Sequence, residues 1–297
     1  SEFSGIPEPP AIIKHWIWHI TNVLCVESEL VPTSWCSKLG LTLLQWFGYM
    51  IQHPEIKLWC PVHKSIEGGG KTLFYEMISE MMGKDYMTTF KSFGQLCGDF
   101  NGDMTGKLLF VLNEATNYPS HEQRETLKML ITDTSLKVNE KYEKRYDDNN
   151  FAKLVITTNN QKPIIIDHND RRYACFKCND KYAGNDEYFA PLIKGVNDVD
   201  QQRELFLYFA NIDLAGFCIS KPPYTKWRNQ LINDGIAAHV SFIADHIATP
   251  ENIRPINMAT LYNYYKDYIN RSESGYKPLG RNMFGNSLKD DLDIEPK

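Results

Sequence analysis

The chain has 297 residues, of which 42% are hydrophobic and 12% aromatic, so it is long enough to bury a large core in one or two domains. Its formal net charge of −5 at pH 7 excludes a globally basic nucleic-acid-binding protein and leaves only local basic patches for such contacts. The seven cysteines are scattered and odd in number, which disfavours a disulfide framework and favours a reducing compartment, the cytoplasm. No apolar run reaches the length of a membrane span, and no signal peptide is visible.

The amino-terminal part is predicted to be helical. Residues 1–10 are interpreted as a tag and linker, and the missing initiator methionine indicates a piece of a longer protein. Apolar residues recur at helical spacing over Ile12–Leu24 and again over Trp35–Ile51, which predicts two helices. The segment 31–34 offers a capping residue for the second helix. Residues 11–54 therefore form a predicted N-terminal helical segment.

A glycine-rich loop follows a short apolar strand that is predicted at Ile56–Val62. The loop ends in Gly-Gly-Gly-Lys-Thr and leads into a helix-like pattern, which is the phosphate-cradling arrangement of P-loop NTPases. Lys71 would reach the β- and γ-phosphates of ATP, and the Thr72 hydroxyl would hold Mg²⁺. The full pattern has Gly where this chain has Ser65, and a solvated glycine turn is the alternative. The expected nucleotide-binding residues are Gly68, Gly69, Gly70, Lys71, Thr72 and Leu73.

Two further predicted strands end in polar residues. Lys107–Leu112 is an apolar run that is followed by Asn113 and Glu114, and Phe151–Thr158 is followed by Asn159. An acid at the end of such a strand orients the Mg²⁺ shell or the attacking water, and Glu114 would carry this role alone. Asn159 would sense the γ-phosphate. The alternative for Glu114 and for Asn159 is that a polar turn residue follows a buried strand by chance.

A basic segment with interleaved aromatic residues lies between these two strands. Ser135–Val138 and Tyr142–Tyr146 are predicted to form the arms of a hairpin. Basic groups contact phosphates, and aromatic faces stack on the bases of single-stranded nucleic acid. The candidate DNA-binding residues are Lys137, Lys141, Tyr142, Lys144 and Arg145. Four acids in the same stretch leave a solvated, mixed-charge hairpin as the alternative.

Two adjacent arginines, Arg171 and Arg172, follow the second of these strands. An arginine at this place can reach a γ-phosphate across a subunit boundary. Simple surface charge, or a pair with Asp170, is the alternative. Beyond the predicted ATPase core at 55–200, helical patterns predict a helical extension at 201–250. Two helices with a polar turn at 251–297 predict a helical or winged-helix-like appendage.

In this order, the glycine-rich loop, Glu114, the basic segment, Asn159 and the two arginines resemble superfamily 3 helicases. The likeness is greatest to the branch that contains the poxvirus D5-like and phage primase-associated helicases. In that branch a segment like Gln45–Pro54 precedes the loop, and a pair like Phe100-Asn101 precedes the acidic strand. Within the branch, the helicase portions of phage primase-polymerases are the expected relatives.

The resemblance implies a P-loop NTPase of the modified AAA+ type, an α/β fold with a parallel sheet flanked by helices. It implies a ring, commonly a hexamer, that hydrolyses ATP with Mg²⁺ between subunits. The ring would pull single-stranded DNA during viral or phage replication in the host cytoplasm. A primase or polymerase would be fused to it or work beside it. A replication initiator without processive unwinding and a nucleotide kinase are the alternatives. The catalytic residues that the resemblance implies are Lys71, Glu114, Asn159 and Arg171 or Arg172.

Overall fold

The computed structural model describes residues 8–25, 37–115, 119–161, 163, 164, 166, 170–235, 242, 243, 256–271 and 278–292. The chain forms two compact units, Ser1–Leu231 and Ile232–Lys297. The division falls inside the segment 201–250, which the sequence analysis groups as one helical extension.

Two helices precede the first strand, as predicted. A 3-10 turn, η1 (Ala11–Ile13), leads into α1 (Lys14–Asn22), and α2 spans Lys38–Gln52. The Ser37 hydroxyl accepts a hydrogen bond from the Gly40 N–H at 3.0 Å and caps α2. The cap that was predicted at 31–34 lies outside the described residues, and α2 begins after Ser37.

A five-stranded parallel sheet forms the centre of the first unit, with the strand order β2-β3-β6-β1-β7. All residues of β3 and β6 are buried, as expected for strands that are covered on both faces. β1 begins at Cys60, later than predicted, because its neighbour β7 begins directly opposite it. The strands are β1 (Cys60–Lys64), β2 (Met87–Phe90), β3 (Leu109–Leu112), β6 (Lys153–Thr158) and β7 (Tyr173–Lys177).

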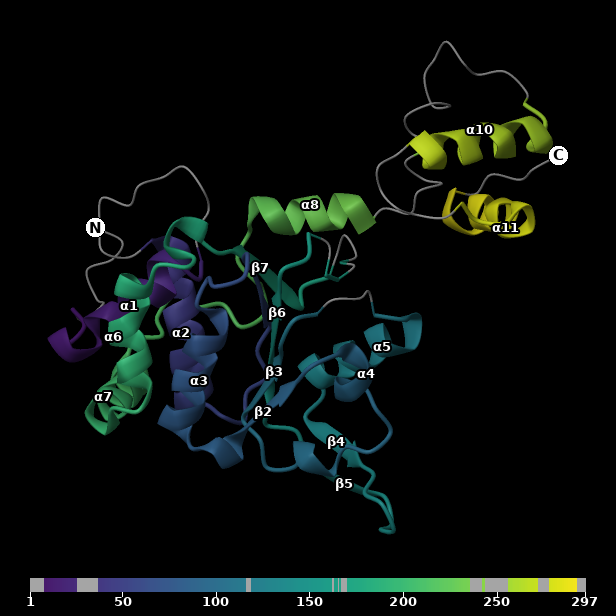
Figure 1. Ribbon diagram of the computed structural model, residues 1–297. Coiled ribbons are helices and arrows are strands. Elements are labelled where there is room, and N and C mark those ends of the chain that lie inside the picture. The colour runs from purple at the N-terminus through teal and green to yellow at the C-terminus, as the bar shows by residue number, and fades with distance from the viewer. Residues whose placement is uncertain are drawn as a thin grey trace. The chain divides into compact units, whose positions relative to one another are not determined.

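Helices cover both faces of this sheet. In Figure 1, α1, α2, α3, α6 and α7 lie on one face, and α4 and α5 lie on the other. The fold predicted from the sequence, a parallel α/β sheet flanked by helices with further helices at both ends of the chain, is confirmed. The remaining helices and turns of this unit are α3 (Lys71–Met82), η2 (Lys84–Tyr86), α4 (Phe93–Leu96), η3 (Gly102–Met104), α5 (His121–Thr132), η4 (Asp180–Tyr182), α6 (Asp186–Val196) and α7 (Val199–Asn211).

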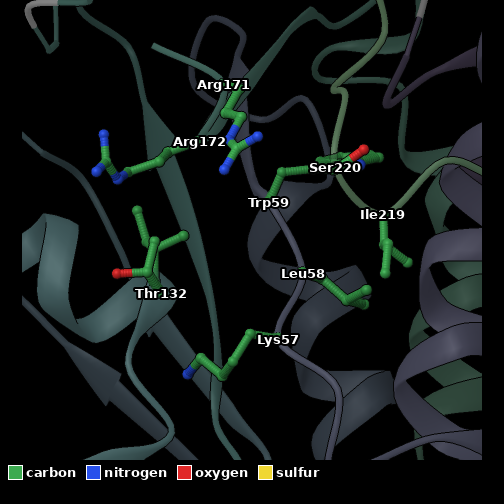
Figure 2. Close-up of a pocket in the computed structure, with 9 residues that line it drawn as sticks. Lys57, Leu58, Trp59, Thr132, Arg171, Arg172, Ile219 and Ser220 are labelled. Atoms are coloured by element: carbon green, nitrogen blue, oxygen red, sulfur yellow. The ribbon is translucent and has the colours of Figure 1, made fainter.

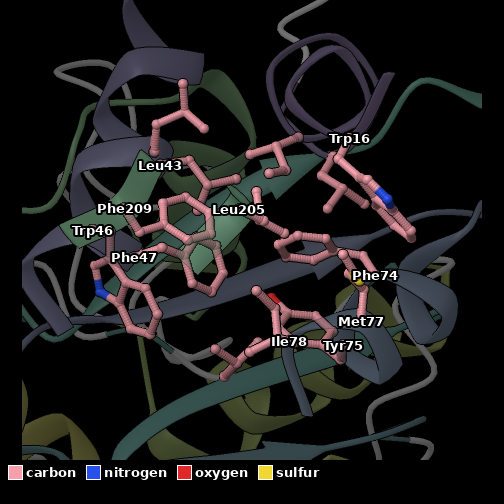
Figure 3. Packing of buried hydrophobic residues seen from close by; sticks show 14 of the residues in the cluster. Trp16, Leu43, Trp46, Phe47, Phe74, Tyr75, Met77, Ile78, Leu205 and Phe209 are labelled. Atoms are coloured by element: carbon pink, nitrogen blue, oxygen red, sulfur yellow. The ribbon is translucent and has the colours of Figure 1, made fainter. Parts of the chain in front are cut away.

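Aromatic side chains hold the larger helical layer together (Figure 3). Phe47 of α2 is fully buried, meets the Phe74 ring of α3 edge to face at 5.2 Å, and lies 5.5 Å from the Phe209 ring of α7. Such pairs contribute about 0.5–1.5 kcal/mol each beyond the burial of apolar area. Since α3 follows the glycine-rich loop directly, this packing also fixes the position of that loop.

A two-stranded antiparallel hairpin, β4 (Ser135–Val138) and β5 (Tyr146–Asn149), lies outside the main sheet. The first arm agrees with the prediction, whereas the second arm, predicted at Tyr142–Tyr146, does not. Tyr142 has a φ of 70°, which is the left-handed region that a strand residue does not adopt. Val138 pairs with Tyr146, so residues 139–145 form the hairpin loop.

The second unit is helical in its described part. It contains α10 (Met258–Arg271) and α11 (Arg281–Leu292), and α8 (Lys226–Gly235) leads into it. Phe284 is fully buried and stacks on Tyr265 with ring centroids 4.3 Å apart, which gives this unit an apolar centre of its own. Within the described residues of both units, none of the helices has the length and apolar character needed to cross a membrane.

Candidate nucleotide-binding site

The loop between β1 and α3 is a narrow turn that only glycine can build. Gly68 and Gly70 have φ values of 73° and 81°, which residues with a β-carbon rarely adopt. A β-carbon added to Gly69 would lie 2.6 Å from the Ser65 Oγ, and one added to Gly70 would lie 2.6 Å from the His19 Cε1. The three consecutive glycines therefore let the turn pack closely against Ser65 and His19. The loop fits the phosphates of a nucleotide.

Lys71 is the first residue of α3 and is only 7% exposed. Its ammonium group donates hydrogen bonds to the Asn159 Oδ1 at 3.0 Å and to the Ser65 hydroxyl. Burial lowers the pKa of Lys71, and the carboxylates of Asp180 and Glu114 act in the opposite direction. A held cation at a helix N-terminus, where the helix dipole is positive, suits phosphate binding.

Ser65 stands where the common phosphate-loop pattern has glycine. The described non-glycine residues with positive φ are Glu114 and Tyr142, so Ser65 keeps an ordinary backbone conformation and needs no glycine. Its side chain is buried and supports the Lys71 ammonium. Serine in place of glycine at position 65 therefore adds a hydrogen bond to the Lys71 ammonium.

The turn Asn113-Glu114 after β3 lies beside β6, the strand that precedes Asn159. This is because β6 is the neighbour of both β1 and β3. Thr157 of β6 is fully buried; its hydroxyl donates to the Asn113 Oδ1 at 2.7 Å and accepts from the Glu114 N–H at 3.4 Å. Glu114 is exposed and has a φ of 56°, a strained conformation that concentrates at functional sites. Thr157 was not identified from the sequence, where it reads as an ordinary strand residue.

Mg²⁺ is commonly held by one or two protein oxygen ligands together with substrate phosphates and water. Thr72 is exposed beside Lys71, and the Glu114 carboxylate acts on the same lysine. In the described ranges, no cluster of three or more His, Cys, Asp or Glu side chains is placed to hold a metal ion. Thr72 and Glu114 thus fit a magnesium ion that is shared with a nucleotide.

A buried histidine from α1 supports the loop, and the sequence analysis missed it. The His19 Nε2 lies 3.3 Å from the Gly70 carbonyl oxygen, and its Nδ1 lies 3.2 Å from the Tyr188 hydroxyl. Burial lowers the pKa of His19 to about 4, so the ring is neutral at pH 7. Both contacts are satisfied when Nε2–H donates to Gly70 and the Tyr188 hydroxyl donates to Nδ1. Helical spacing alone contains no signal for this long-range contact.

The two arginines lie at the other end of the sheet from the phosphate loop. They precede β7, whereas the loop follows β1, and these strands are parallel. Figure 2 shows both arginines at a cavity of about 500 Å³ with Lys57 and Trp59. The Arg172 Nη1 pairs with the Asp170 Oδ1 at 3.3 Å, whereas Arg171 is exposed. One chain therefore does not bring Arg171 or Arg172 to its own phosphate loop.

The candidate DNA-binding residues gather on the exposed hairpin. Lys137 lies in β4, and Lys141, Tyr142, Lys144 and Arg145 lie in the loop. Tyr142 is fully exposed. The structure therefore keeps these residues together and apart from the phosphate loop.

Phe100 and Asn101 support this hairpin from the segment before β3. The Asn101 side chain donates to the Lys137 carbonyl at 2.9 Å and accepts from the Asn139 N–H at 2.8 Å. Phe100 is 58% exposed, and the Lys141 ammonium lies 5.4 Å from the centre of its ring. Phe100 is thus an exposed aromatic face beside a cation, which the sequence analysis identified only as part of a motif.

A glycine-rich phosphate loop that joins a central parallel strand to a helix gives this chain the fold of P-loop NTPases. Residues 63–172 match a family model described as a family of unknown function, DUF5906, which covers less than half of the chain. The chain is also 28% identical over 177 residues to the DNA primase-polymerase of Nitratiruptor phage NrS-1, a match that covers 59% of this chain and 23% of that protein. The chain is homologous to this phage protein and spans about a quarter of its length.

Solved structures of the same phage protein share the fold. The apo structure of the NrS-1 C terminal region matches with a TM-score of 0.66 at 16% identity, covering 97% of this chain and 72% of the other. The A form apo structure of that region matches with a TM-score of 0.65 at 16% identity, covering 96% and 71%. The predicted relationship to phage primase-polymerases is confirmed, and identity this low shows a common fold alone.

Proposed function

We propose that this chain is an ATP-driven DNA helicase domain of superfamily 3, acting in phage DNA replication beside or fused to a primase or polymerase. The observation that carries the proposal is the 3.0 Å hydrogen bond between the Lys71 ammonium and the Asn159 side chain. It joins two residues 88 positions apart at the loop that best fits phosphates. In a solvated glycine turn, the lysine would lie in water and would need no such partner.

The buried lysine and the loop N–H groups would bind the β- and γ-phosphates of ATP. Asn159, which already accepts a hydrogen bond from Lys71, would orient the γ-phosphate or the attacking water. Glu114, on its strained turn beside β6, would position that water. Mg²⁺ held by Thr72 and Glu114 would neutralise charge that develops on the transferred phosphoryl group.

The position of the two arginines supports ATP hydrolysis at the boundary between two copies of the chain. Arg171 and Arg172 precede β7 and the phosphate loop follows β1, so an arginine of one copy would act on ATP bound to the next. Contacts of this head-to-tail kind close into rings. A ring, which we propose to be hexameric, would then have one ATP site at each boundary, and an arginine supplied in trans contributes about 10³- to 10⁵-fold to turnover in other systems.

The hairpin is the element that would contact DNA. Its loop combines Lys141, Lys144 and Arg145 with the exposed rings of Tyr142 and Phe100. Cations bind the phosphate backbone and aromatic rings stack on bases without sequence preference. Such contacts suit translocation along single-stranded DNA of any sequence.

ATP hydrolysis with and without single-stranded DNA, over a series of salt concentrations, tests this proposal. Strong stimulation that weakens with salt is the expected result, because phosphate contacts release counterions. Hydrolysis without stimulation would contradict a DNA-driven motor. Strand displacement distinguishes the initiator alternative, which would bind DNA and hydrolyse ATP without unwinding a duplex. Mass photometry with ATP tests the ring.

A further inference from the structure

The free edge of the sheet is closed by the first residues around α8. β7 is the last strand in the order β2-β3-β6-β1-β7, so one of its edges has no strand partner among the described residues. The Thr225 hydroxyl donates to the Cys175 carbonyl at 2.7 Å, and the Arg228 Nε donates to the Tyr173 carbonyl at 3.0 Å. We call Thr225–Arg228 the edge turn. Side chains of the edge turn replace part of the missing ladder.

Arg228 also encloses the arginine pair. Its Nη2 donates to the Asp170 carbonyl and its Nε to the Tyr173 carbonyl, which are the residues directly before Arg171 and directly after Arg172. The Asp170 carboxylate is buried and accepts from the Arg172 N–H at 2.9 Å and from the Arg172 Nη1 at 3.3 Å. The backbone of the pair is therefore held on both sides, while the Arg171 side chain stays exposed.

Trp227 extends toward the opposite end of the sheet. Its ring is buried, and its Nε1 donates to the Gln161 carbonyl at 3.3 Å. The Lys64 ammonium, at the end of β1, lies 5.9 Å from the centre of the same ring and also bonds the Gln161 side chain. Gln161 stands two residues after Asn159. Trp227 thus contacts the segment after Asn159, which we call the sensor segment. The next residue of the edge turn, Arg228, contacts the segment that carries the two arginines.

We infer that the edge turn positions the arginine pair for the neighbouring copy and links that position to the nucleotide sensed at Asn159. This inference rests on the proposed hydrolysis between copies. Arg228 is the positioning residue, and Arg171 is the arginine that reaches the ATP of the next copy, because Arg172 is committed to Asp170. A shift of the sensor segment would move Trp227, and through the same turn Arg228 and the pair.

Mixing two inactive variants tests the inference. Lys71→Ala cannot use its own ATP site but keeps its arginines, and Arg228→Ala keeps its ATP site but holds its arginines poorly. Alone, Arg228→Ala is expected to bind a fluorescent ATP analogue as the unaltered chain does and to lose about 10²-fold in turnover, since small misplacements of a catalytic group cost this much. In an equal mixture, about a quarter of the head-to-tail boundaries combine the two intact halves, so about a quarter of the activity is expected to return.

Two controls separate the possible failures. Arg203→Ala removes an exposed arginine of α7 and is expected to change neither binding nor turnover. Arg171→Ala mixed with Lys71→Ala is expected to recover activity in the same way as the Arg228→Ala mixture. If the Arg171→Ala mixture recovers and the Arg228→Ala mixture does not, Arg228 is merely structural and the inference is overturned while the proposed function stands. If neither mixture recovers, hydrolysis between copies is overturned, and the inference with it.

Two further variants test the chemistry of the edge turn. Arg228→Lys keeps a cation but replaces the two separated guanidinium nitrogens with one, so it is expected to hold both carbonyls less well. Its turnover is expected to lie between those of the unaltered chain and Arg228→Ala. Trp227→Phe removes the donor to Gln161 and part of the buried ring. It is expected to slow turnover without weakening nucleotide binding and to recover in the same mixture. Unchanged turnover of Trp227→Phe would overturn the link to the sensor segment.

Discussion

The phosphate loop and the β4–β5 hairpin differ in where their functional groups find partners. At the loop, Lys71 is 7% exposed and is held by Asn159 within the same chain. At the hairpin, Tyr142 is fully exposed and Lys141 lies over an exposed ring. The proposed ATP site is thus largely preorganised by the fold, which would favour catalysis by fixed charges. The hairpin keeps its cations in solvent, which would suit the proposed contact with DNA, since that contact would form and break at each step.

Replacing Lys71 with Ala is expected to have the largest effect. It should abolish the function of the phosphate loop and leave that of the hairpin intact. The γ-phosphate loses its main cation, so ATP hydrolysis should fall by about 10³-fold or more. DNA binding without nucleotide should stay unchanged, because the hairpin keeps all its groups. Steady-state phosphate release and fluorescence anisotropy of labelled DNA measure the two properties. Retained hydrolysis would contradict the phosphate-loop assignment.

Replacing Glu114 with Gln should separate nucleotide binding from ATP hydrolysis at the phosphate loop. The amide keeps the shape of the turn but cannot activate water as a carboxylate does, so turnover should fall by about 10²- to 10³-fold. Nucleotide affinity should change little, which equilibrium binding of a fluorescent ATP analogue would measure. An equal loss of affinity and turnover would instead place Glu114 in ground-state binding.

Acid should weaken the loop side of the molecule through His19, the buried histidine that contacts the loop. The pKa of His19 is lowered to about 4 by burial, from an ordinary value of 6.5, so the unfolded chain takes up a proton more readily than the folded one. The stability that this neutral ring contributes is present above pH 6.5 and is lost as the pH falls toward 4. At pH 5 the loss is on the order of 2 kcal/mol.

Urea denaturation at pH 7.5 and pH 5 measures this loss. His19→Gln cannot titrate and should have a smaller difference between the two pH values. His53→Gln removes a histidine beyond the end of α2 that is half exposed and should keep the full difference. An identical pH dependence in the unaltered chain and His19→Gln would contradict the role of this ring.

The smallest effect is expected on the hairpin side. Lys141→Ala combined with Lys144→Ala should leave basal ATP hydrolysis intact and reduce the salt dependence of DNA binding, with a slope smaller by about 2. The matched control is Lys14→Ala with Lys84→Ala, two exposed lysines outside the hairpin, which should leave the slope unchanged. Equal losses of basal and DNA-stimulated hydrolysis would make the hairpin a structural element of the ATP site.

Local patterns were sufficient for much of the fold. A strand before the loop, the glycine turn and a helix after it were all predicted, because glycine runs and apolar periodicity act over a few residues. The second arm of the hairpin was placed wrongly, since a β-like composition at Tyr142–Tyr146 does not reveal a left-handed residue at its start. The first strand was predicted to begin too early, since its start is set by its pairing with β7.

The sequence by itself determined the order of the motifs: a glycine-rich loop, then an acid after one strand, then an amide after the next, which together predict a nucleotide site. Only the tertiary structure decided that β6 lies between β1 and β3 and so places Asn159 against Lys71. It alone set His19 against Gly70, and it alone placed Arg228 against the Asp170 carbonyl, next to Arg171. These contacts join residues 51 to 88 positions apart. Packing of whole elements decides such pairs, whereas local propensity acts only along neighbouring residues.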